Sequence, residues 1–142
     1  MEIGCQVYIK GSAEAVELYM KAFGAELGYN VRNDDGSYYH AELSMDGRPM
    51  LAVSEAKSDI GIADKSKYTP ECYPPMQFGV TLSGERDVAM AYDILKEGAN
   101  ILLPLGKLPW SDCCASLVDK FGVCWYLSVR QHRPDGDWQP ER

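Results

Sequence analysis

Two helix-like segments, about half the chain apart, end in the same way, and this repetition constrains the fold more than any other feature. Apolar residues recur at helical spacing, at Val16, Tyr19, Met20 and Phe23 in the first segment and at Val88, Ala91, Tyr92 and Leu95 in the second. Each segment is followed by a Gly-Ala pair, Gly24-Ala25 and Gly98-Ala99, whose glycine suits the left-handed end of a helix. Ser12 is suited to cap the first helix. The chain therefore reads as a duplicated unit.

Strand-like runs surround each predicted helix in the same order. The predicted strands are 3–9, 26–33, 37–45 and 49–55 around the first helix, and 76–82, 101–105, 111–119 and 123–130 around the second. Asp35-Gly36 and Asp46-Gly47 separate the runs of the first half, and Asp-Gly is a strong hairpin signal. The sequence thus predicts an α+β fold made of two βαβββ modules.

The length of 142 residues fits one structural domain that contains both modules. We divide the chain into a first module (1–56), a linker (57–74), a second module (75–130) and a tail (131–142). The linker is polar and ends in prolines, and we expect it to be able to fold over a site.

The charge and cysteine content of the chain disfavour some classes of function and indicate a cellular compartment. The net charge is −7 and lysines and arginines form no stripe, which disfavours binding to nucleic acid or to an anionic membrane surface. No apolar run is long enough to span a bilayer, and the first residues lack the features of a signal peptide. Five cysteines without a CxxC pair favour free thiols in a reducing cytoplasm.

Three stretches carry a resemblance to a known superfamily: SAEAVELYMKAFGAEL at 12–27, HAELSMDG at 40–47, and the closing run 104–129. The closing run keeps the family residues Pro104, Leu105, Trp110, Asp112, Asp119, Phe121, Gly122 and Trp125, and departs from the family pattern at Ser111, Cys113, Cys114 and Lys120. The chain resembles the vicinal-oxygen-chelate superfamily of glyoxalase I, extradiol dioxygenases and bleomycin-resistance proteins, and most closely its PhnB-like group. The resemblance implies mixed β-sheets that curl around a cleft, with the helices on the outer face.

Strand alternation divides the side chains between helix and cleft. We expect Tyr39, Ala41, Leu43, Met45, Val123, Trp125, Leu127 and Val129 to face the helices. We expect the cleft to be lined by Gln6, Tyr8, Tyr38, His40, Glu42, Gln77, Thr81, Trp110, Asp112, Cys114, Ser116 and Tyr126. Its aromatic members suit a flat or cationic ligand.

Metal-dependent relatives take one His or Glu from each of four strands. By the resemblance, these positions fall near Gln6 (or Gly4), Ala52, Gly79 and Tyr126. Glycine and alanine offer no ligand atom, and glutamine is a poor ligand for transition metals. We therefore expect no metal and no cofactor, which disfavours glyoxalase I or extradiol dioxygenase chemistry.

Two groups could carry acid-base or nucleophilic chemistry. His40 and Glu42 lie two residues apart on one strand, as a general base and its orienting carboxylate would, or as a purely structural polar pair. Cys114 could form a couple with His40, although a buried, inert cysteine is the commoner case. No catalytic residue follows from the sequence, and whether the protein is an enzyme stays open.

The favoured function is metal-independent binding of a small molecule in the cleft. The alternatives are an enzyme that uses His40 and Glu42, and a structural dimer with a vestigial cleft. We expect a homodimer, because a module with exposed strand edges tends to be covered or paired.

Overall fold

The computed structural model describes residues 1–58, 65–134, 136 and 139, and in them the βαβββ order occurs twice. The first module contains β1 (Gln6–Ile9), α1 (Ser12–Phe23), β2 (Glu26–Arg32), β3 (Tyr38–Met45) and β4 (Arg48–Glu55). A short 3-10 helix, η1 (Lys65–Lys67), precedes the second module. The second module contains β5 (Phe78–Thr81), α2 (Glu85–Leu95), β6 (Asn100–Leu108), β7 (Ser111–Val118) and β8 (Cys124–Ser128). The predicted α+β fold of two βαβββ modules is confirmed.

Each module forms its own four-stranded mixed sheet. The strand orders are β1-β4-β3-β2 and β5-β8-β7-β6, so the second sheet repeats the first. In each sheet the first strand pairs in parallel with the last, and the remaining neighbours are antiparallel. No helix in the described residues has the length and apolarity needed to cross a bilayer.

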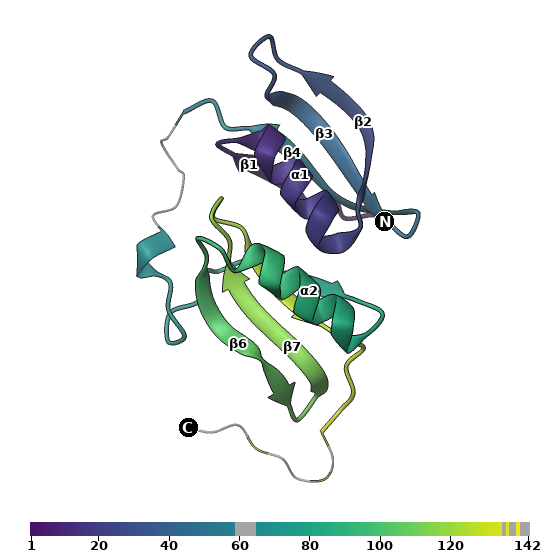
Figure 1. Cartoon of the computed structure of the whole chain (residues 1–142), viewed down its shortest axis with the longest axis vertical. Helices are drawn as coiled ribbons and strands as arrows, with labels where there is room; N and C mark the ends of the chain where they lie inside the picture. The colour runs from purple at the N-terminus through teal and green to yellow at the C-terminus, as the bar shows by residue number, and fades with distance from the viewer. Residues whose placement is uncertain (59–64, 135, 137–138, 140–142) are drawn as a thin grey trace.

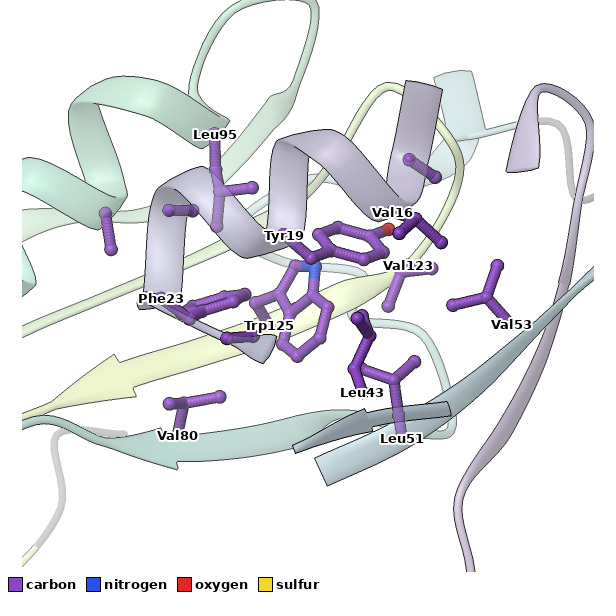
Figure 2. Packing of buried hydrophobic residues seen from close by; sticks show 14 of the residues in the cluster. Val16, Tyr19, Phe23, Leu43, Leu51, Val53, Val80, Leu95, Val123 and Trp125 are labelled. Atoms are coloured by element: carbon purple, nitrogen blue, oxygen red, sulfur yellow. The ribbon is translucent and has the colours of Figure 1, made fainter. Parts of the chain in front are cut away.

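One hydrophobic core joins the two modules. The helices α1 and α2 lie side by side, each on its own sheet (Figure 1). Tyr19 and Phe23 of α1 pack against Trp125 of β8, with ring centroids 5.2 Å and 5.0 Å apart (Figure 2). The helix-bearing faces of both sheets therefore meet in this core. The helix-free faces, where we predicted the cleft, consequently point away from each other.

The sequence suggested that Ser12 caps the N-terminus of α1. In the structure, a carboxylate distant in sequence caps it instead. Glu55, at the end of β4, accepts hydrogen bonds from the backbone N–H groups of Gly11 and Ser12 at 3.2 Å and 2.9 Å. The Ser12 hydroxyl also donates to Glu55 and accepts a bond from the backbone of Tyr38. A negative charge beside the positive end of a helix is stabilising, so this cap ties α1 to its own sheet.

Candidate functional site

The helix-free face of the first sheet contains an open hollow of about 930 Å³. Residues from β1, β3, β4 and the β2–β3 turn line it, among them Gln6, Tyr8, Lys10, Asn33, Tyr39, His40 and Ser54. Tyr8 and Tyr39 are 70% and 65% exposed, so two aromatic rings stand open to solvent in the hollow. Aromatic walls with a few polar groups are the usual composition of a small-molecule site.

A second hollow of about 460 Å³ lies on the same sheet and is more apolar. Its lining includes Cys5, Tyr29, Glu42, Met50 and Ala52. His40 lines the larger hollow and Glu42 the smaller, so the pair contributes one side chain to each.

The predicted His40–Glu42 pair is close in space. His40 Nε2 lies 3.3 Å from Glu42 Oε2, and the two side chains are 31% and 50% exposed. The ring of Tyr29 packs beside the imidazole, with centroids 6.1 Å apart. A carboxylate beside one ring nitrogen holds the imidazole in a defined orientation, as a general base needs.

The predicted cleft position of Tyr38 is wrong. Its side chain is 3% exposed and belongs to the core, whereas Tyr39, predicted to face the helices, lines the hollow. The pairing of β2 with β3 explains the exchange: Val31 pairs with His40, but Arg32 pairs with Tyr38. Tyr39 is thus the extra residue of a β-bulge, and alternation changes phase there.

Other residues of the hollow were absent from the sequence prediction. Lys10, Asn33 and Ser54 come from the end of β1, the β2–β3 turn and β4. Ser54 could have been found from its spacing, because it lies two residues beyond Ala52 on the same face of β4. Lys10 and Asn33 lie outside regular strands, where alternation makes no prediction.

The helix-free face of the second sheet is covered by the chain itself. Leu102, Val118 and Cys124 form a small buried cluster there, apart from the main core, and Tyr68 of the linker packs against it. Tyr68 thus places part of the linker on this face of the second sheet. Residues 59–64 of that linker lie outside the described residues.

Two of the predicted cleft residues on this face are buried. Cys114 and Ser116 are 0% and 1% exposed, and Gln77 Nε2 donates to Ser116 Oγ at 2.7 Å. Burial raises the pKa of Tyr73 in the linker, and nearby Cys124 and Cys114 add to this effect. Cys114 therefore lies on the predicted face of β7 but is closed to solvent.

The remaining predicted residues also belong to the second module. Trp110 Nε1 donates to the Tyr126 hydroxyl at 3.1 Å. Burial raises the pKa of Tyr126, although the bond from Trp110 lowers it. Asp112 is exposed, with Oδ1 3.9 Å from Lys107 Nζ, and Thr81 is exposed at the edge strand β5.

The structure does not bring Cys114 and His40 together. His40 belongs to the first sheet and Cys114 to the second, and their helix-free faces point in different directions. A Cys114–His40 couple within one chain is therefore excluded by geometry.

The four positions that hold the metal in metal-dependent relatives carry Gln6, Ala52, Gly79 and Tyr126 in this chain. Gln6 is paired with Ala52, and Gly79 with Tyr126, so two of the four positions offer no ligand atom. The Gln6 amide donates to Ser54 Oγ at 3.1 Å. Within the described residues, no three His, Cys, Asp or Glu side chains gather as a metal site would require. The residues present do not fit the family's metal.

The comparisons with known proteins agree with the resemblance. No family model and no curated protein matches the sequence. Among solved structures, a PhnB protein from Bacillus cereus is 26% identical, with a TM-score of 0.68 over 91% of this chain and 99% of that one. A Pseudomonas aeruginosa protein is 18% identical, with a TM-score of 0.72 over 92% and 98% of the two chains. A glyoxalase/bleomycin-resistance/dioxygenase domain from Frankia is 14% identical, with a TM-score of 0.62 over 91% and 94%.

The chain accordingly has the vicinal-oxygen-chelate fold, with PhnB-like and glyoxalase/bleomycin-resistance proteins among its structural neighbours.

Proposed function

We propose that this protein binds a small organic molecule, without a metal, on the helix-free face of the first sheet. The observation that carries the proposal is the 930 Å³ hollow in which Tyr8 and Tyr39 stand exposed beside His40. Exposed aromatic side chains that line one concavity are uncommon on a surface without a binding role. They offer stacking surfaces, while Gln6 and His40 offer hydrogen bonds that fix the orientation of a ligand.

The proposed assembly is a homodimer. β1 and β2 are the edge strands of the first sheet, and Tyr8 on β1 is largely exposed. A second copy laid over this face would cover the edge and close the open side of the hollow. Light scattering should give twice the mass of one chain at micromolar concentration, and the mass of a single chain would contradict the dimer. We also propose a cytoplasmic location, in keeping with five free thiols.

A thermal-shift screen of aromatic compounds, followed by titration calorimetry of each hit, tests the binding function. A true ligand should raise the melting temperature in a saturable way in the wild type. Tyr8→Ala and Tyr39→Ala should weaken its binding, while Met90→Ala, at an exposed position of α2, should leave it unchanged. Hits insensitive to both tyrosine variants would place binding elsewhere, and a screen without hits would favour a structural dimer with a vestigial cleft.

The His40–Glu42 contact favours a second candidate, an acid-base enzyme acting on the same ligand. If a ligand is turned over, His40→Gln should abolish turnover while the ligand still binds. If the pair is only structural, the same variant should change affinity or stability and reveal no lost reaction.

A further inference from the structure

Two Asp-Gly pairs lie at hairpin turns of the first sheet, and their surroundings differ. Asp35-Gly36 lies between β2 and β3, whereas Asp46-Gly47 joins β3 to β4, at the tip of the β3 arrow in Figure 1. We propose that Asp46 is a site of spontaneous modification, where the aspartyl link to Gly47 converts to an isoaspartyl link, while the fold protects Asp35. The proposal is independent of the binding function proposed above.

The reaction at Asp46 needs only the two residues and water. The backbone nitrogen of Gly47 bonds to the side-chain carboxyl carbon of Asp46, and one carboxyl oxygen leaves as water with the amide hydrogen and the carboxyl proton. The product is a five-membered succinimide. Water then adds to the α-carbonyl carbon and breaks its bond to nitrogen, so the chain continues through the β-carbonyl and the α-carboxylate becomes free. The water lost in the first step is regained in the second.

Both reacting groups are accessible at Asp46-Gly47. Residues 46 and 47 are exposed, and within the described chain no hydrogen bond or ion pair holds the Asp46 carboxylate. The Gly47 nitrogen likewise donates none of the turn hydrogen bonds of the described residues. A carbon added to Gly47 would meet no heavy atom within 4 Å apart from its chain neighbours, so the space around this residue is open.

The turn at Asp46 is also strained and lightly held. Asp46 has a φ of 53°, and among the described residues no other residue with a side chain has a positive φ. The second residue pair from the turn joins Ser44 to Pro49, which has no N–H to donate, and the register shifts between Leu43 and Ser44. A turn held by few hydrogen bonds opens at a low free energy, which lets the nitrogen reach the carboxyl carbon.

The matching groups are tied at Asp35-Gly36. The Gly36 nitrogen donates to the carbonyl oxygen of Asn33 at 3.0 Å. Asp35 Oδ1 accepts hydrogen bonds from the Ser37 backbone N–H at 2.9 Å and from the Ser37 hydroxyl at 2.6 Å. These bonds from Ser37 lower the pKa of Asp35 and keep its carboxyl ionised, the form that a nitrogen attacks least readily. The chain therefore carries its own matched control for Asp46.

Isomerisation at Asp46 would alter the second hollow. The isoaspartyl link adds one methylene to the main chain of the turn between Met45 and Arg48, which pair with each other across β3 and β4. Gly47, Pro49 and Met50 line the hollow of about 460 Å³. An aged molecule should therefore differ from a fresh one in the shape of this hollow.

The test follows both Asp-Gly pairs in the folded wild-type protein, incubated at neutral pH and sampled over time. Cleavage after glutamate places Asp35 in peptide 27–42 and Asp46 in peptide 43–55, and electron-transfer fragmentation identifies the isoaspartyl form of each. Isoaspartate should accumulate at Asp46 at least about tenfold faster than at Asp35, because several hydrogen bonds must first break at Asp35. In urea the two rates should become similar. Equal rates in the folded protein, or the same difference in urea, would overturn the proposal.

A serine variant tests the reason for the protection of Asp35. Ser37→Ala removes the hydroxyl bond to Asp35 and should raise the isomerisation rate at Asp35 several-fold without changing the rate at Asp46. Ser83→Ala, which removes a hydroxyl bonded to Asp87 in the second module, is the matched control and should change neither rate. Circular dichroism establishes that each variant is folded. A folded Ser37→Ala protein with an unchanged rate at Asp35 would contradict the protective role of this contact.

Discussion

Tyr19 Oη donates a hydrogen bond of 2.6 Å to Asp119 Oδ2, and this bond joins α1 of the first module to the β7–β8 turn of the second. Both residues are fully buried. Asp119 also accepts bonds from the indole of Trp125 and from the backbone N–H groups of Phe121 and Val123. The carboxylate thus organises its own turn and holds the two modules together at one point.

Removing the Tyr19 hydroxyl should destabilise the protein most at neutral pH. Burial raises the pKa of Asp119, although its four hydrogen bonds lower it, so the carboxyl protonates more readily in the folded state. Tyr19→Phe removes a donor to the ionised form and should cost about 1.5–3 kcal/mol of unfolding free energy at pH 7.

The raised pKa of Asp119 also predicts how the cost of Tyr19→Phe changes with pH. A raised folded-state pKa favours folding below the unfolded value and loses that contribution as pH rises through the folded value. Since Tyr19→Phe raises the pKa of Asp119 further, the penalty should shrink as the carboxyl protonates in acid. Urea unfolding at pH 7 and near pH 4 measures this, with Tyr92→Phe on α2 as control. An equal penalty at both pH values would contradict the role assigned to the bond.

The pKa of Glu55 is shifted in the opposite direction to that of Asp119, although the penalty for removing its charge should also shrink in acid. Burial raises the pKa of Glu55, but hydrogen bonds from Ser12 and Gly11 outweigh it and lower the pKa overall. The stabilisation is therefore present above the unfolded pKa and is lost as pH falls through the lowered folded value. Glu55→Gln should cost about 1 kcal/mol at pH 7, as the loss of a helix cap does, and less in acid. Circular dichroism melts across this pH range measure the effect, and a penalty that grows in acid would argue against it.

The replaced ligand positions predict the metal content. Because Ala52 and Gly79 carry no ligand atom, protein purified without added metal should contain zinc, iron and nickel only far below one equivalent per chain. Elemental analysis measures this directly. A stoichiometric amount that survives dialysis against a chelator would show that other residues bind a metal.

Alternation predicted the faces of β8 correctly, because that strand pairs without a break with β5 and β7. It failed at Tyr38 and Tyr39, because the bulge belongs to the pairing of β3 with β2 and leaves no mark on one strand's sequence.

The sequence likewise predicted only in part that the linker covers the helix-free face of the second sheet. The composition of the linker indicated a segment able to fold over a site. That Tyr68 lies on Leu102 and Val118 depends on tertiary contacts between distant residues, and no local pattern encodes them. The βαβββ repeat could be predicted because it rests on local periodicity, whereas the difference between an open and a closed face could not.

Leu127 and Tyr126 are neighbours on β8 whose side chains face opposite ways. They give the most direct test of which face of β8 packs against the helices. Leu127 is 0% exposed in the shared core, while Tyr126 is partly exposed on the helix-free face. Leu127→Ala should lower the unfolding free energy by about 2–5 kcal/mol, because it leaves a cavity beneath the helices. Tyr126→Phe removes the hydroxyl that accepts the bond from Trp110 and should cost about 1 kcal/mol. Urea unfolding of the two variants at one pH compares these costs directly. If the tyrosine variant were the more damaging of the two, the faces assigned to Leu127 and Tyr126 on β8 would be exchanged.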